Sequence, residues 1–226
     1  MCKETFLRLP EEKRARIVNA AWDEFAAVPF ADASINRVIR AAGIPRGSFY
    51  QYFEDKNDLF RYLLSQLSGE LEEQALKLLA DCGGNLFQAA LTGYDRFQAE
   101  QRRGNKIPVF DRCVSLVRIN PGVDLEAVGR GRRPDKARVM QELLAGVDKA
   151  PFRRQDAPFL AEICRMAGMC LFGAIMDCLS EPGQEDERRR ELLDELDILR
   201  RGSYGAEALR DADAPQGAEH TEGGFA

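Results

Sequence analysis

The pattern that most constrains the fold is a pair of short helical stretches joined at Gly43. Residues 34–42 carry apolar side chains at helical spacing behind Ser34, a residue type that often caps a helix start. Gly43 follows, where a tight turn needs a positive φ that a side chain resists. Pro45 then opens a second short helix that runs through Phe53. Two short helices meeting at such a turn indicate a helix-turn-helix.

A third helix precedes this pair and a longer one follows it. The preceding helix is expected to start near Pro10 and to stop at Pro29. Its buried stripe is expected to comprise Ile17, Ala20, Ala21 and Phe25. Lys56 begins the longer helix, which extends to about Leu79 and is long enough to connect two parts of the molecule.

The rest of the chain also indicates an all-α fold, because short alternating runs rich in Val, Ile and Thr are absent from the sequence. Asp156 is a suitable N-cap for the most apolar helix. From Ser203 the chain is Gly/Ala-rich and acidic, which predicts a disordered tail. Further helices are expected over 86–101, 110–119, 136–147, 157–180 and 186–201.

Composition argues against several classes of protein. The 226 residues include one histidine, and the six cysteines form no C-x-x-C pair. We therefore expect no metal site, no cofactor and no catalytic triad or Cys–His dyad, so the chain should not be an enzyme. The longest apolar stretch, 160–179, is interrupted by Glu162, Arg165 and Asp177, and no secretory signal precedes it. A cytoplasmic protein without a membrane span is expected.

The net charge of −5 does not suggest a nucleic-acid ligand, but the local charge does. Residues 34–53 contain three arginines and no Asp or Glu. Phe49 and Phe53 lie four apart and can anchor the second helix of the pair to the core. Arg46 or Gln51 could then read base edges, while hydroxyls donate to phosphates. The side chains left for the exposed sides are Arg46, Gly47, Ser48, Tyr50, Gln51 and Tyr52.

The segment Val38–Leu59, with its Ala-Gly-Ile, Gly-Ser-Phe-Tyr-x-Tyr-Phe and Lys-x-x-Leu strings, closely resembles the DNA-reading head of the TetR (tetracycline-repressor-like) family. The specific match covers residues 10–65. The resemblance implies DNA-binding positions at Ser34, Asn36, Arg37, Arg46, Gly47, Ser48, Tyr50, Gln51, Tyr52 and Lys56. Among them, Lys56 would bind a phosphate, whereas Tyr50 and Tyr52 could instead be packing aromatics.

The resemblance also implies the division of the chain. It predicts a helix-turn-helix domain at 1–70 (motif about 34–53), a helical effector-binding and dimerisation domain at 71–202, and the tail at 203–226. The apolar helix 159–179 supports a dimer, since a helix that is apolar on nearly every side must be buried on two fronts. The interface is expected to comprise Ala167, Gly168, Gly173, Ala174, Leu192, Leu193, Leu196 and Leu199.

An effector cavity is implied in the same domain. Its lining candidates are Phe87, Tyr94, Phe97, Phe110, Met140, Phe159, Met166, Met169 and Phe172, although ordinary core packing is the alternative for each. Cys164 and Cys178 lie on one helix face and could sense oxidants, but buried inert thiols are the simpler interpretation.

The function expected from the sequence is therefore a ligand-responsive regulator. It would be a homodimer in the cytoplasm, associated with the nucleoid. It would repress transcription by binding a palindromic operator, and a small-molecule effector would release it from the DNA. The alternative is a co-regulator that keeps the fold but acts through protein contacts.

Overall fold

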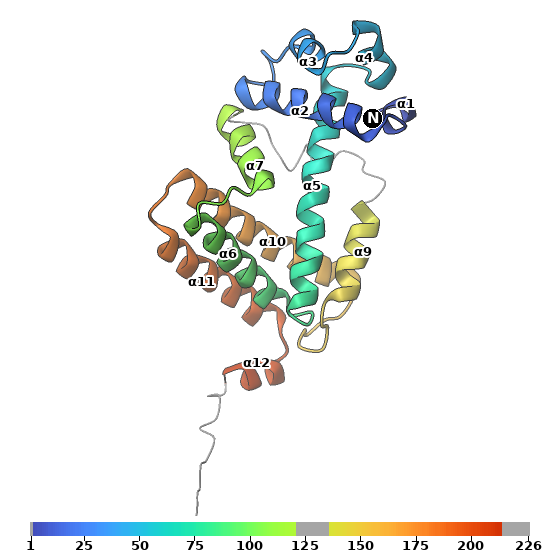
Figure 1. Cartoon of the computed structure of the whole chain (residues 1–226). Helices are drawn as coiled ribbons and strands as arrows, with labels where there is room; N and C mark the ends of the chain where they lie inside the picture. Colours follow the sequence, from blue (N-terminus) through green and yellow to red (C-terminus); the bar gives the residue numbers. More distant parts are fainter. Residues whose placement is uncertain (1, 121–135, 214–226) are drawn as a thin grey trace, which may run out of the picture.

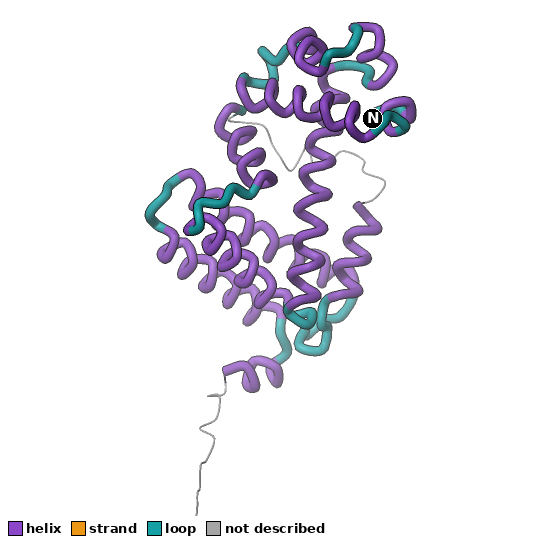
Figure 2. The backbone as a smooth tube through the Cα atoms, in the orientation of Figure 1, coloured by secondary structure: helices purple, strands orange, loops and turns teal. Residues whose placement is uncertain are grey.

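The computed structural model describes residues 2–120 and 136–213, which fold as packed α-helices (Figures 1 and 2). Within that part of the chain the only β feature is an isolated bridge between Phe152 and Tyr204, so the all-α prediction is confirmed. The helices are α1 (Glu4–Leu7), α2 (Glu11–Ala27), α3 (Ile35–Ala42), α4 (Arg46–Tyr52), α5 (Lys56–Asp81), α6 (Leu86–Arg102), α7 (Pro108–Ile119), α9 (Lys136–Gly146), α10 (Ala157–Ser180), α11 (Glu185–Ser203) and α12 (Ala206–Asp213).

Helices α1–α4 and the start of α5 form a small head at one end of the molecule (Figure 1). Gly43 has φ 62°, as the turn between α3 and α4 requires, and its N–H donates to the Arg40 carbonyl. The head has its own apolar core, whose fully buried members are Phe6, Ile17, Phe25, Phe49, Phe53 and Leu59.

Helix α5 joins the head to the body without a break. It begins at Lys56 as expected, because the Asp55 carboxylate caps it by accepting the N–H of Asp58. Its first turns pack in the head, and its far end packs against α6 and α9 (Figure 1). The predicted domain boundary at residue 70 thus falls inside one continuous helix, so the head and the body share a rigid element.

The body is built around α10, which packs against α6, α7, α9 and α11. Asp156 caps α10 by accepting the N–H of Phe159, as its sequence position predicts. By length and composition alone α10 could cross a membrane, a criterion that core helices of soluble proteins also meet. Only 28% of its most apolar window is buried inside the chain, so a large apolar face of α10 is left uncovered.

The prediction of a disordered tail from Ser203 is wrong for residues 203–213. Ser203 is fully buried, and the Tyr204 ring packs edge-on against Phe152 at 5.1 Å between ring centroids. The carbonyl of Ser203 accepts the N–H of Arg153, and α12 follows. The local sequence is polar, but the packing of the Tyr204 ring on Phe152 holds this segment against the body. Residues 214–226 lie outside the described part of the chain.

Candidate nucleic-acid interface

The exposed side of α4 is the candidate reading surface. Phe49 is fully buried and holds α4 to the core, while Arg46, Gly47 and Gln51 are exposed and the Tyr50 side chain is 41% exposed. Ser48 is half-buried. The seven-residue helix therefore has one anchored side and one polar side that faces solvent, as predicted, except that Tyr52 is buried with the anchored side.

A polar cluster links α3 to α4 on this surface. The Arg46 guanidinium donates to Oδ1 of Asn36 at 2.6 Å and to the Tyr50 hydroxyl at 3.4 Å. It also lies 5.8 Å from the centre of the Tyr50 ring. A guanidinium has five N–H donors, so Arg46 keeps donors for a base edge or a phosphate while Asn36 and Tyr50 hold it in place.

Ser34 occupies the N-cap position of α3, but its side chain does not cap the helix. Instead, the Glu24 carboxylate of α2 accepts the Ser34 N–H at 2.6 Å. The hydroxyl is thus not used for capping, which leaves it for the phosphate contact that the resemblance implies. Sequence reasoning missed Glu24, because nothing local marks an acid on α2 as the partner of the α3 start.

The same carboxylate changes the interpretation of Arg37. Its guanidinium forms a bidentate ion pair with Glu24, with an Nη2–Oε1 distance of 2.6 Å, and donates to the Asp32 carbonyl at 3.0 Å. The Arg37 hydrogen bond holds the pKa of Glu24 below its usual range. Arg37 therefore ties α3 to α2, and the expectation that it touches DNA is not supported by where its donors point.

The expectation that Lys56 binds a phosphate is also contradicted. Its ammonium donates to three backbone carbonyls of the α2–α3 turn, those of Phe30 (2.6 Å), Ala31 (2.9 Å) and Ala33 (3.1 Å). It also lies 4.7 Å from the centre of the Phe30 ring. A lysine has three N–H donors, and all three are used here. Lys56 fastens the turn to the start of α5.

Tyr52 belongs to the core of the head. Only 6% of the residue is exposed, and its ring lies 5.8 Å from that of Phe6 in α1. The Lys13 ammonium lies 5.9 Å from the centre of the Tyr52 ring. Of the two tyrosines that the sequence left undecided, Tyr50 faces solvent, and Tyr52 is a packing aromatic because α1 covers it.

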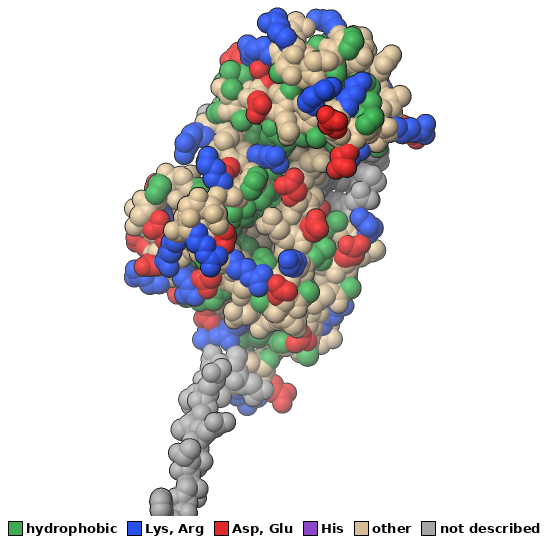
Figure 3. All heavy atoms as spheres, viewed as in Figure 1, with side chains coloured by type: hydrophobic (Ala, Val, Ile, Leu, Met, Phe, Trp, Pro, Cys, Tyr) green, Lys and Arg blue, Asp and Glu red, His purple; other side chains and the backbone are tan. Residues whose placement is uncertain are grey.

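Basic and acidic side chains are both visible over the head, as they are over α6 and α11 (Figure 3). Within the head, residues 34–53 contain three arginines and no Asp or Glu. The predicted positions whose side chains or backbone remain available to DNA are Ser34, Asn36, Arg46, Gly47, Ser48, Tyr50 and Gln51. This surface can offer hydroxyl, amide and guanidinium groups to phosphates and base edges.

The predicted effector-lining residues do not form one site. Met166 and Met169 are exposed on α10, so their assignment to an interior cavity is wrong. Met140, Phe159 and Phe172 are half-buried. Phe97 of α6 packs on Phe110 of α7, with 5.5 Å between their ring centroids, and also on Tyr94 of α6. Phe87 packs instead with Phe152 and Tyr204.

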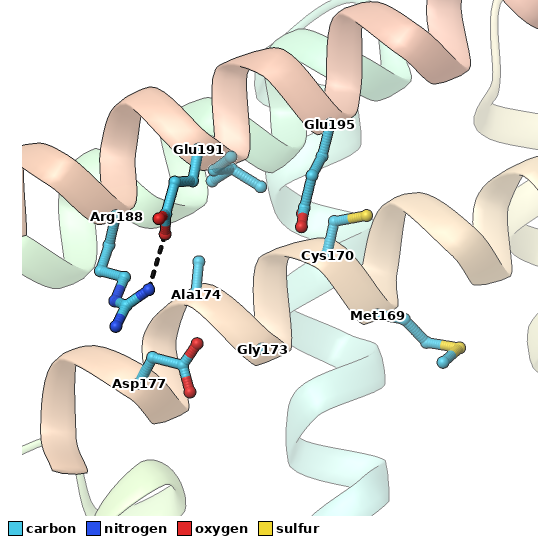
Figure 4. Close-up of a pocket in the computed structure, with 9 residues that line it drawn as sticks. Met169, Cys170, Gly173, Ala174, Asp177, Arg188, Glu191 and Glu195 are labelled. Carbon is cyan, nitrogen blue, oxygen red and sulfur yellow. Dashed lines mark hydrogen bonds and ion pairs between the residues drawn. The ribbon is translucent and has the colours of Figure 1, made fainter.

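The structure has a hollow of about 240 Å³ between α10 and α11 (Figure 4). It is lined by Met169, Cys170, Gly173, Ala174, Asp177, Arg188, Glu191, Leu192 and Glu195, of which only Met169 was an expected effector contact. A second hollow, of about 230 Å³, lies between α2 and α7 beside Trp22 and Arg112. Neither hollow is lined by the aromatic side chains that the sequence predicts for an effector site.

Half of the residues expected at the dimer interface are instead buried within a single chain. Ala167, Ala174, Leu192 and Leu196 are buried in the body core, because α10 and α11 pack closely on each other. Their assignment to an intersubunit seam is therefore wrong. Gly168 and Leu193 are exposed, and Gly173 and Leu199 are half-buried. Other exposed apolar residues on these two helices are Met166, Met169 (52% exposed) and Ile198 (70% exposed), and Met169 lines the hollow.

Cys164 and Cys178 lie in environments that favour the protonated thiol. Burial raises the pKa of Cys164 to about 11, and burial likewise raises the pKa of Cys178, whose sulfur lies 2.7 Å from the Tyr94 hydroxyl. Because the thiolate is the reactive form, these thiols are poorly suited to sensing oxidants. Within residues 2–120 and 136–213, no group of three His, Cys, Asp or Glu side chains could hold a metal ion.

Residues 17–63 match the family model described as bacterial regulatory proteins, tetR family. The chain is 32% identical over 74 residues to the uncharacterized HTH-type transcriptional regulator YdgC of Bacillus subtilis, and 31% identical over 108 residues to the HTH-type transcriptional regulator AcrR of Shigella flexneri. These matches cover 33% and 46% of this chain, and 38% and 50% of those relatives.

A likeness of fold extends over most of the chain. The structure of SmeT, the repressor of the Stenotrophomonas maltophilia multidrug efflux pump SmeDEF, superimposes with a TM-score of 0.54. The alignment covers 94% of this chain and 99% of SmeT at 16% sequence identity. The match to the family model thus lies in the head, whereas the likeness of fold to SmeT extends over the body as well.

Proposed function

Residues 17–63 make this chain a member of the tetR family of bacterial regulatory proteins, and from this premise we propose that it is a cytoplasmic DNA-binding transcription regulator. It would bind a palindromic operator as a homodimer, as a repressor associated with the nucleoid. The observation that carries the proposal is the Asn36–Arg46–Tyr50 cluster on the exposed side of α4.

The cluster supports DNA reading because it is assembled before DNA arrives. A free arginine loses side-chain entropy when it binds a base, whereas Arg46 is already held by an amide and an aromatic ring. Two other cations of the head bind groups within the head itself: Arg37 binds the Glu24 carboxylate, and Lys56 binds the Phe30 carbonyl. Arg46 is thus positioned to reach the acceptor edge of a guanine in the major groove.

The dimer that we propose uses the uncovered face of α10 and α11. Met166 and Met169 on α10 and Ile198 on α11 have exposed apolar side chains, and Met169 and Gly173 also line the hollow of Figure 4. A second copy with the same face would cover them in a four-helix arrangement. The two heads of the dimer would then bind the two inverted half-sites of the operator.

We place the effector site in the body, between α6 and α7. The rings of Phe97 and Phe110 meet there, so a ligand that separates them would displace α7. Helix α7 packs against α2 of the head, and the side chain of Asn120 at its end accepts the Phe30 N–H at 2.8 Å. Release from DNA would follow if the ligand bound the displaced form more tightly.

Arg46→Ala tests the proposal most directly. After operator selection with the purified protein, this variant should lose about 1–3 kcal/mol of binding free energy per half-site, and preference should relax at one base position. Arg190→Ala on α11 is the matched control, since it removes the same exposed charge from the body. Electrophoretic mobility shifts over operator variants give the affinities.

Two results would contradict the proposal. The wild-type protein could select no DNA sequence, or Arg46→Ala could leave affinity and preference unchanged. Either result would favour the co-regulator that acts through protein contacts.

A further inference from the structure

Residues 3–6 pack against the end of the recognition helix α4. The backbone N–H of Lys3 donates to the Tyr52 carbonyl at 2.9 Å, and the Lys3 ammonium donates to the Tyr50 carbonyl at 2.7 Å. The hydroxyl of Thr5 donates to the carbonyl of Gln51. Three consecutive carbonyls at the end of α4 are therefore bound by a segment that lies more than forty residues earlier in the sequence.

These bonds meet a specific need of α4. The last four carbonyls of any α-helix have no partner within the helix. In a helix of seven residues they form a large share of all the carbonyls, so the helix end would fray. The ammonium of Lys3 also places positive charge at the C-terminal end of α4, where the helix dipole favours it.

Phe6 fixes the segment in place. Its side chain is fully buried, and its ring lies 4.6 Å from that of Phe53 and 5.1 Å from that of Tyr62, measured between ring centroids. The segment is thus joined to α5 through Tyr62 and to the end of α4 through Phe53. It connects the tip of the recognition helix to the helix that enters the body.

We propose that residues 3–6 act as a brace that sets the position of α4 on DNA, and that Lys3 and Thr5 are positioning residues for sequence-specific binding. The inference rests on the proposed function. Two of the three carbonyls that the brace holds belong to Tyr50 and Gln51, whose side chains are exposed on the reading surface. Movement of the brace therefore moves reading residues.

Loss of the brace should affect contacts to DNA bases more than contacts to the DNA phosphates. A bidentate contact to a base edge depends on close geometry, whereas contacts to phosphates tolerate small displacements because they are mainly electrostatic. Loss of the brace should therefore reduce operator affinity more than affinity for DNA of unrelated sequence. A role confined to folding would reduce both affinities together.

Thr5→Val is the sharpest variant, because it removes the hydroxyl and keeps the shape of the side chain. We expect operator affinity to fall by about 3- to 10-fold, in line with one lost hydrogen bond. Affinity for scrambled DNA should stay within about twofold by the same reasoning. Thr5→Ser should restore operator affinity. Arg8→Gln is the control, since Arg8 pairs with Glu4 on the exposed side of α1 and does not reach α4.

Hydrogen exchange of the free protein tests the brace without DNA. Thr5→Val and Lys3→Met should speed exchange of the α4 amides selectively, while those of α10 keep wild-type rates. Unchanged exchange in α4 would overturn the brace, as would equal losses of operator and scrambled-DNA affinity in Thr5→Val. If the wild-type protein bound no specific DNA but α4 exchange rose as expected, the proposed function would fail and the brace would stand.

Discussion

The head and the body use their charged side chains in opposite ways. In the head, Lys3, Arg37 and Lys56 bind groups that are distant in sequence, and most of their partners are backbone carbonyls. In the body, several ion pairs join residues three or four apart on one helix, such as the exposed pairs of Arg165 with Glu162 and Arg201 with Asp197. Exposed pairs of this kind contribute little to stability.

The difference follows from size and from what each surface meets. A small head buries too little apolar area to fix short helices by packing alone, so polar tethers supply the rest. The body has a larger core and can leave an apolar face on α10 and α11 uncovered. The difference agrees with the proposed function, in which the head binds DNA and the body binds a second copy of the chain. Substitutions in both regions test it.

The largest effect is expected from Ile198→Glu. Helical spacing places Ile198 on the same side of α11 as Glu191 and Glu195, which line the hollow. A second subunit on this face would bury the new carboxylate, and symmetry would bury two of them. We expect at least about 3 kcal/mol lost from dimerisation, a change from dimer to monomer in sedimentation, and loss of binding to a palindrome.

Leu193→Glu is its control. Leu193 is also exposed on α11 but lies about 140° away around the helix, so the dimer should persist. A dimer that survived Ile198→Glu would place the interface elsewhere.

Lys56→Met should have the next largest effect, now on the head itself. It removes three hydrogen bonds from an ammonium to the α2–α3 turn, which should lower the free energy of unfolding by about 2–4 kcal/mol. Urea unfolding followed by far-UV circular dichroism measures the loss. The slope of binding against salt concentration should stay near the wild-type value, since the ammonium does not face DNA. A slope reduced by about one unit would return Lys56 to the phosphate-binding role.

The smallest effects separate the two tyrosines. Tyr50→Phe should cost about 0.5–1.5 kcal/mol of operator binding, because the exposed hydroxyl is lost beside Arg46. Tyr52→Phe keeps the ring that packs on Phe6 and should leave operator affinity within about twofold. Mobility shifts at one salt concentration measure the operator affinity of each variant. Equal losses would mean that the Tyr52 hydroxyl also reaches the DNA.

The features that could be predicted from the sequence are those that local chemistry decides. Gly43 specifies its turn, Asp156 its helix start, and the spacing of Phe49 and Phe53 the buried side of α4. Local patterns do not reveal partners. The apolar stripe of α11 predicts that Leu192 and Leu196 are covered, but whether this chain or a second copy covers them depends on tertiary packing.

The same limit explains the errors in the head. A lysine at the start of α5 can reach outward to a phosphate or inward to the turn, and the sequence does not distinguish the two directions. The structure shows the inward one. The packing of Tyr52 was hidden for a related reason, because the covering residue Phe6 lies in the short helix α1, which the sequence pattern did not reveal.

Helix α5 also has a mechanical consequence. Its 26 residues span about 39 Å at 1.5 Å per residue, with one end in the body and the other beneath the reading surface. If the body end tilts by about 10°, the head end travels roughly 7 Å, which is about two base-pair steps of DNA at 3.4 Å each. An unbroken helix therefore works as a lever arm, and a movement too small to unfold any part of the body could still set two heads out of register with their half-sites.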